Sequence, residues 1–191
     1  MDIKDFNIKC CEILKNIKEE DGLYGYYNGR IKKNEVLNID DQLLIKYFLE
    51  NVDKKCNILE IAAGIGQVSH YLNLNGFNNI TINECDKKRL GLVCKLNNEL
   101  CNNCITSLNK YQTIDLNNYD FIFTLNGVSS HLGNLNDLPI FEKFLDNDKK
   151  IILKEGYFGK TGDTSFTDKL KEKYNYETLV ETNTSILMFF K

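Results

Sequence analysis

The 191-residue sequence has little that would divide it into separate parts. It contains a single proline, Pro139, and it lacks Gly/Ser-rich linkers, low-complexity blocks and repeats at solenoid spacing. No stretch approaches the roughly 18 apolar residues of a membrane span, and the N-terminus mixes acids and bases, unlike a signal peptide. These absences exclude fibrous, repetitive and membrane-spanning proteins, and we expect one globular domain of ordinary size.

The chain also lacks a strong charge of one sign. Its 24 basic and 27 acidic residues give a net charge of −3, which argues against broad attraction to nucleic acid or to an anionic membrane. The seven cysteines are an odd number scattered through apparently regular structure, so we expect reduced thiols in a cytoplasmic protein. Cys101 and Cys104 form a CxxC, but no second CxxC or paired histidine follows, and the sequence predicts no metal site.

Hydrophobic periodicity divides the chain near residue 55. Residues 3–17 have helical spacing, residues 21–38 read as a tyrosine-rich loop, and Asp40 and Asp41 suit the start of a second helix. We expect residues 1–54 to form an N-terminal helical lid or extension that packs on a core domain of residues 55–191.

Apolar runs and helical patterns alternate through the core domain. The runs lie at residues 58–62, 80–82, near 105, and at 119–125, 150–154, 176–181 and 185–190. Such alternation predicts a parallel sheet flanked by helices. The last two runs leave no room for a crossover helix, so they must pair as an antiparallel hairpin. The predicted fold is therefore α/β and Rossmann-like, with a mostly parallel seven-stranded sheet that ends in an antiparallel hairpin.

The segment NILEIAAGIGQVSHY, residues 57–71, carries the strongest chemical signal. An apolar strand runs into Glu60 and then into a series of small residues before a helix, namely Ala62, Ala63, Gly64 and Gly66. Small residues allow a tight turn and let a ligand approach the main chain. Glu84 follows the next strand, where an acid can accept hydrogen bonds from ribose hydroxyls. This pattern predicts a nucleoside site.

Two kinds of nucleoside ligand fit this pattern. Gly64-x-Gly66-x-x-Ser69 is a dinucleotide fingerprint with serine in place of the third glycine, which would indicate an NAD(P)-dependent oxidoreductase. No Tyr-x-x-x-Lys pair of the short-chain dehydrogenases occurs among the ten tyrosines. A pyrophosphate also gains nothing from a carboxylate such as Glu60, whereas a ligand with an ammonium group does. The acid therefore favours a cationic ligand.

Glu60-x-Ala62-x-Gly64-x-Gly66 resembles the first motif of the class I S-adenosylmethionine (SAM)-dependent methyltransferases, with Ala62 in place of a glycine. The resemblance covers roughly residues 55–191 and implies SAM as cofactor and S-adenosylhomocysteine (SAH) as product. It also implies further cofactor contacts, made by Glu84 to the ribose, by Cys85 and Asn109 to the adenine, and by Asn126 beside the methyl donor. Because Ala62 departs from the motif, a non-catalytic nucleoside-binding module stays open as an alternative.

A methyltransferase of this kind would act on an oxygen or nitrogen atom of its acceptor. His131 follows the fourth strand, and its ordinary pKa suits proton removal near neutrality, so it is the candidate catalytic base. Tyr24, Tyr27 and Arg30 are candidates for binding the acceptor from the lid. Glu155, at the end of the fifth strand, is a further acceptor contact.

The acceptor class follows from what surrounds Asn126. After Leu125 the chain reads Asn-Gly-Val, which differs from the Asn-Pro-Pro-Tyr motif of many enzymes that methylate amino groups of nucleic acids. Together with the acidic net charge, this argues against nucleic acid and for a small hydroxylated or amine-bearing molecule. The sequence indicates no membrane partner and does not specify an oligomeric state.

Overall fold

The computed structural model describes residues 1–15, 24–125, 135–156, 165–181 and 185–191, with the backbone alone at 24–26, 155–156, 165 and 185. Its seven strands form one sheet in the order β3-β2-β1-β4-β5-β7-β6. The strands are β1 (Ile58–Ile61), β2 (Ile80–Asn83), β3 (Ile105–Ser107), β4 (Phe121–Thr124), β5 (Lys150–Gly156), β6 (Tyr176–Glu181) and β7 (Ser185–Phe190). Strands β1 to β5 pair in parallel, whereas β7 is antiparallel to both β5 and β6.

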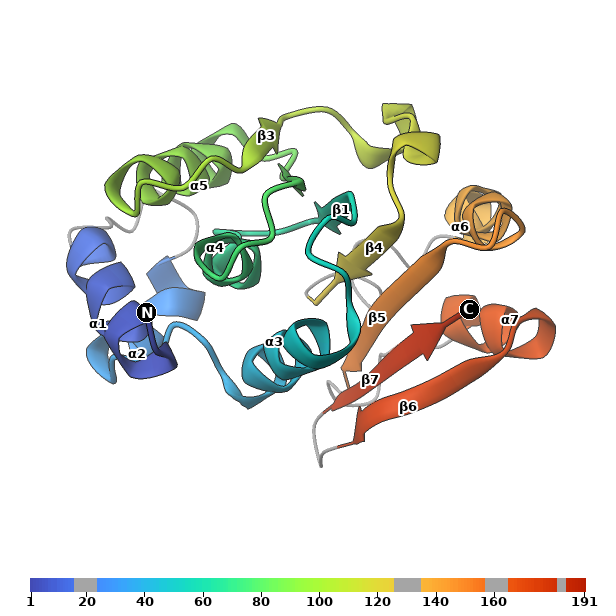
Figure 1. The fold of residues 1–191 in the computed structure, drawn as a ribbon, viewed down its shortest axis with the longest axis horizontal. Coiled ribbons are helices and arrows are strands. Elements are labelled where there is room, and N and C mark those ends of the chain that lie inside the picture. Colours follow the sequence, from blue (N-terminus) through green and yellow to red (C-terminus); the bar gives the residue numbers. More distant parts are fainter. Residues whose placement is uncertain (16–23, 126–134, 157–164, 182–184) are drawn as a thin grey trace.

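The helices cover both faces of this sheet (Figure 1). They are α1 (Ile3–Leu14), α2 (Tyr24–Lys32), α3 (Ile39–Asn51), α4 (Gln67–Leu74), α5 (Lys87–Glu99), α6 (Leu138–Leu145) and α7 (Ser165–Lys173). Because side chains alternate between the faces of a strand, the sheet serves two cores. Ile58, Ile82 and Phe123 pack with α1 to α5, whereas Leu59 and Ile122 pack with α6 and α7.

The predicted architecture is confirmed, including the mostly parallel sheet and the terminal hairpin. Strands β6 and β7 have the bounds expected from the sequence. Strand β7 lies between β5 and β6, so the last strand in sequence pairs with β5 and the sixth strand forms the edge of the sheet. This order puts the apolar β7 in the interior and leaves the polar β6 at the edge, as the burial of their side chains shows.

The N-terminal region differs from the sequence prediction in one element. Residues 24–32, expected within a loop, form helix α2. Two glycines and three tyrosines give this segment weak intrinsic helix propensity, but Tyr27 is only 1% exposed and joins the core formed with α1 and α3. Tertiary burial therefore stabilises a helix that local propensity does not favour. Helix α3 begins as expected, with Asn38 as its N-cap and a capping box that includes Asp41.

Within the described ranges, no helix has the length and apolar character needed to cross a membrane.

Candidate functional site

A tight turn connects β1 to α4 and is called here the glycine loop (residues 62–66). The Ala63 N–H donates to the Asn83 carbonyl over 3.1 Å, and the Gly66 N–H donates to the Ala63 carbonyl over 3.0 Å. Ala62, Gly64 and Gly66 have φ values of 53°, 64° and 67°, in the left-handed region that favours glycine. A Cβ on Gly66 would lie 3.0 Å from the Ile82 side chain. The turn thus requires glycine at 66 and holds Ala62 in a strained conformation.

Glu84 connects the end of β2 to this loop. Its side chain is 3% exposed, and its Oε2 accepts a hydrogen bond from the Gly64 N–H at 2.9 Å. Its Oε1 accepts from the Asp86 N–H, also at 2.9 Å. An ionised carboxylate offers about four acceptor positions, so Glu84 keeps capacity for ligand hydroxyls while it stays anchored to the glycine loop.

Glu60 lies in β1 at the base of the same loop and is 1% exposed. Burial raises the pKa of its carboxyl group to about 8, Ser69 opposes the shift, and the carboxylates of Asp41 and Glu84 add to it. Neither Oε2 of Glu60 nor Oγ of Ser69 has a hydrogen-bond partner among the described residues. A buried carboxyl oxygen without a hydrogen-bond partner is rare in proteins, and this oxygen can accept from a cationic ligand.

A buried polar network joins α2 to the glycine loop. The Tyr27 hydroxyl donates to Oε1 of Gln67 over 3.1 Å, and a Cβ on Gly64 would lie 3.2 Å from that hydroxyl. The Gln67 amide nitrogen is 3.5 Å from Oδ2 of Asp41. Nη1 of Arg30 lies 3.6 Å from the same oxygen. Tyr27 and Arg30, predicted as acceptor-binding residues, therefore stand beside the predicted cofactor site.

A second buried ion pair lies next to this network. Nζ of Lys154, near the carboxyl end of β5, is 2.7 Å from Oδ2 of Asp40, and the two side chains are 14% and 9% exposed. Sequence analysis read Asp40 only as a helix-start residue and did not single out Lys154. The sequence did carry one signal for this pair, because Lys154 ends the apolar run 150–154. A charged side chain on a buried strand needs a partner of opposite charge.

The expected adenine contacts lie at the ends of β2 and β3. Nδ2 of Asn83 donates to the Asn109 carbonyl at 2.7 Å and to the Ser107 carbonyl at 3.3 Å. This bond places the exposed Asn109 next to the end of β2, where Cys85 is also exposed. Asn83 was missed by sequence analysis, since its role is to join two strands that are distant in sequence.

A further connection links the segment after β3 to the start of α6. The Tyr111 hydroxyl donates to the Asp137 carboxylate, and the Gln112 amide lies 3.3 Å from the other oxygen of that carboxylate. Sequence analysis also missed this contact, which spans 26 residues. It joins the segment that follows β3 to the residues that begin α6.

The remaining predicted residues are not placed in full. Asn126 and His131 lie outside the described residues. Tyr24 begins α2 and Glu155 lies in β5, but only their backbones are described. Across the described ranges, no group of three or more His, Cys, Asp or Glu side chains could hold a metal ion.

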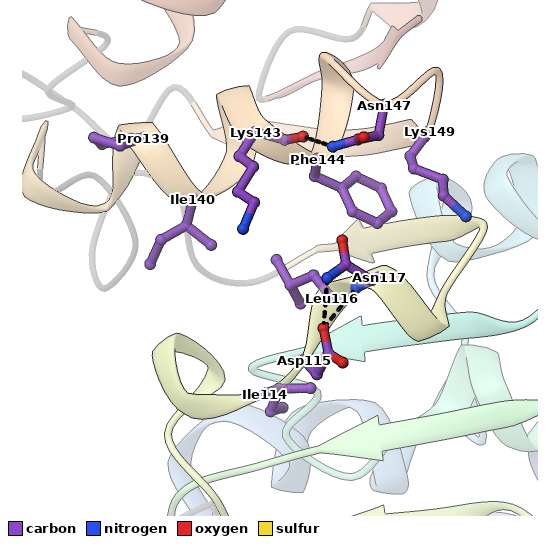
Figure 2. Close-up of a pocket in the computed structure, with 10 residues that line it drawn as sticks. All are labelled: Ile114, Asp115, Leu116, Asn117, Pro139, Ile140, Lys143, Phe144, Asn147 and Lys149. Carbon is purple, nitrogen blue, oxygen red and sulfur yellow. Dashed lines mark hydrogen bonds between the residues drawn. The ribbon is translucent and has the colours of Figure 1, made fainter.

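A groove of about 260 Å³ lies elsewhere, between α6 and the segment before β4 (Figure 2). Leu116 and Asn117 precede β4, and Asn147 and Lys149 precede β5. Ligands of open α/β sheets bind instead outside the carboxyl ends of the strands. None of the predicted site residues lines this groove, so the glycine loop is the stronger candidate site.

Comparisons with known proteins find similarity in structure only. No protein-family model matches the chain, and no curated protein matches it in sequence. Many solved structures share its fold. One is magnesium protoporphyrin IX methyltransferase from Synechocystis PCC 6803 with bound SAM, with a TM-score of 0.65 and 10% identity over 98% of this chain and 94% of that chain. The same enzyme is also known with bound SAH.

Two further structures extend the comparison. The bifunctional kinase-methyltransferase WbdD has a TM-score of 0.67 and 12% identity over 95% of this chain, which spans 45% of the WbdD chain. The ribosomal protein L11 methylase from Lactobacillus delbrueckii subsp. bulgaricus has a TM-score of 0.62 and 12% identity over 81% of this chain and 79% of that chain. The chain therefore has the fold of the class I SAM-dependent methyltransferases.

Proposed function

We propose that this protein is a SAM-dependent methyltransferase that transfers a methyl group to an oxygen or nitrogen atom of a small molecule. The observation that carries the proposal is the pairing of Glu84 with the Gly64 N–H, beside the unpartnered carboxyl oxygen of Glu60. Both lie near the point where the strand order reverses, since β1 is flanked by β2 on one side and β4 on the other. Open α/β sheets bind ligands at this position.

The residues at the glycine loop match the chemistry of SAM in three respects. Glu84 has acceptor capacity for two ribose hydroxyls, and Gly64 and Gly66 allow close approach of the cofactor to the main chain. Glu60 offers a carboxyl oxygen to the positively charged end of the cofactor. When bound, SAM supplies a methyl group already activated by a cationic sulfur, so the protein mainly aligns the reactants and excludes water.

The other predicted residues complete the proposal. Cys85 and Asn109 would flank the adenine, and Asn126 would lie beside the methyl donor. Residues 1–54 would act as a lid, in which Tyr24, Tyr27 and Arg30 contact the acceptor together with Glu155 of the core domain. His131 would remove the proton from an acceptor hydroxyl or ammonium group.

The charges around the loop support a small acceptor that is neutral or cationic. Four buried acidic residues lie at this edge of the sheet, namely Asp40, Asp41, Glu60 and Glu84. Two cations of the described residues lie beside them, Arg30 next to Asp41 and Lys154 next to Asp40. A site lined by buried acids offers no net positive charge to a phosphate backbone, which a nucleic-acid substrate would bring.

Binding measurements test the cofactor assignment. We expect isothermal titration calorimetry to detect SAM and SAH and to detect no NADH. Glu84→Ala should raise the Kd for SAM by at least about tenfold, because a hydrogen bond to a charged group is worth roughly 1.5–3 kcal/mol. Glu99→Ala, at an exposed glutamate that ends α5, is the control and should bind SAM normally. Binding of NADH without SAM would contradict the proposal.

Turnover measurements test the acceptor and the base. Incubation with methyl-labelled SAM and a metabolite extract should yield a labelled small molecule, whereas label that appears only in protein or RNA would contradict the acceptor class. His131→Ala should lower turnover most near neutral pH, where the wild-type imidazole is largely unprotonated and can take the acceptor proton. At acidic pH the wild-type imidazole is itself protonated, so the two proteins should differ less. Unchanged turnover at every pH would exclude His131 as the base.

A further inference from the structure

The protonation state of Glu60 is the feature that the proposed function leaves unused. The residue lies within β1, paired in register with Ile82 of β2 and Phe123 of β4. Its side chain is 1% exposed, and both of these strand neighbours are fully buried and apolar. Glu60 is thus an acid in the apolar interior of the sheet, at the base of the loop that would hold the cofactor.

The groups that face Glu60 from the elements around it supply no positive charge. Helix α4 contributes Ser69, through both its hydroxyl and its backbone N–H, α3 contributes the Asp41 carboxylate, and the end of β2 contributes Glu84. The segment before β3 contributes the Cys104 thiol, whose Sγ is 3.9 Å from the Ser69 carbonyl. Two of these four groups are acids, and the other two are uncharged polar groups.

The cations beside this cluster contact aspartates and not Glu60. Nη1 of Arg30 lies 3.6 Å from Asp41, and Nζ of Lys154 lies 2.7 Å from Asp40. An ionised carboxylate without a counter-charge is strongly disfavoured in an apolar interior. The least costly state of Glu60 in the ligand-free protein is therefore the neutral carboxylic acid, in agreement with its pKa of about 8.

We propose that Glu60 carries a proton in the ligand-free protein and releases it when SAM binds at the glycine loop, so that cofactor binding is coupled to proton release. The inference rests on the proposed function. The carboxylic O–H bond breaks, the proton passes to solvent, and the carboxylate that remains is stabilised by the positive charge of the ligand. Glu60 thereby makes the site selective for ligands that carry a cation.

Calorimetry in two buffers with different protonation enthalpies measures this proton directly. With wild-type protein at pH 7.0, SAM binding should release about 0.9 proton, the protonated fraction of an acid with a pKa one unit above the solution pH. The Kd for SAM should fall by about 20-fold between pH 6.0 and pH 7.5, because binding must displace less proton as the pH rises.

Two controls identify Glu60 as the source. Glu60→Gln keeps the shape and stays neutral, so its SAM binding should release no proton from this site, and its Kd should change little with pH. Titration of the amino group of SAM itself contributes equally to both proteins and cancels in the comparison. In wild-type protein, 5′-methylthioadenosine shares the adenosine and the thioether but carries no charge, and it should bind without proton release.

The outcomes separate the two proposals. Tight SAM binding without proton release would overturn the role of Glu60 and leave the methyltransferase assignment intact. Equal release by wild type and Glu60→Gln, or equal release with SAM and 5′-methylthioadenosine, would assign the proton to another group and also overturn it. Absence of SAM binding would reject the proposed function, and the inference with it.

Discussion

A glycine-to-alanine substitution in the glycine loop should destabilise the protein strongly, although the same change elsewhere stabilises it. Gly66 has a φ of 67° and is the N-cap of α4, and an alanine Cβ would lie 3.0 Å from both Cδ1 and Cγ2 of Ile82. The left-handed conformation costs an L-residue roughly 1–2 kcal/mol, and overpacking costs roughly 1–3 kcal/mol. The lower entropy of the unfolded chain offsets about 0.4–1 kcal/mol. We expect Gly66→Ala to lower the free energy of unfolding by about 2–4 kcal/mol.

Gly91 provides the matched control for this prediction. It lies within α5 and is exposed, and no atom comes within 4 Å of a Cβ built on it. Gly91→Ala should therefore raise the free energy of unfolding by about 0.5–1 kcal/mol, since alanine favours a helix interior. Urea denaturation followed by circular dichroism measures both variants against wild type. The geometry of the loop would be refuted if Gly66→Ala were as stable as wild type. It would also be refuted if both variants changed the free energy of unfolding in the same direction.

Three further experiments test the buried polar groups. The pKa of Glu60, about 8, lies above its ordinary value of 4.5, so the folded protein binds the extra proton between these values and stability falls as pH rises through this window. Between pH 6.0 and pH 7.5 the free energy of unfolding of wild type should fall by about 2 kcal/mol relative to that of Glu60→Gln, as measured by urea denaturation. The same pH dependence of unfolding free energy in both proteins would contradict this. Lys154→Met removes the cation paired with Asp40 and should lower the free energy of unfolding by about 3 kcal/mol. The double variant Lys154→Met/Asp40→Asn should recover most of this loss. A double variant as unstable as the single variant would argue against the ion pair. Tyr27→Phe should offset about 1 kcal/mol of the loss caused by Gly64→Ala, because it removes the contacting hydroxyl; strictly additive losses would contradict that contact.

The fold was accessible from the sequence because its signals are local. Apolar runs mark β1, β2, β4, β5 and β7, whereas β3 and β6 give weaker signals. The three polar residues 182–184 leave too little chain between the last two strands for anything but a hairpin. The glycine loop could be predicted for the same reason, since the acid and the small residues are consecutive. The position of Glu84 beside Gly64 then followed from the rule that parallel strands end at one edge of the sheet.

The missed features depend on contacts between distant parts of the chain. Helix α2 forms because Tyr27 is buried against the core, which the weak helix propensity of its own segment does not reveal. Lys154 and Asp40 pair across 114 positions, and Tyr111 and Asp137 pair across 26. No local pattern distinguishes these charged and polar residues from solvated ones. Only the packing of α2, α3 and α6 on the sheet brings them together.

The central claim is that Glu84 and the glycine loop hold SAM at the carboxyl edge of the sheet. A crystal structure of the protein with SAH tests it most directly. We predict that both ribose hydroxyls donate to the carboxylate of Glu84 and that the amino-acid end lies against Gly64 and Gly66. A ligand found instead in the groove beside α6, or a Glu84 side chain without contact to the ribose, would contradict the claim.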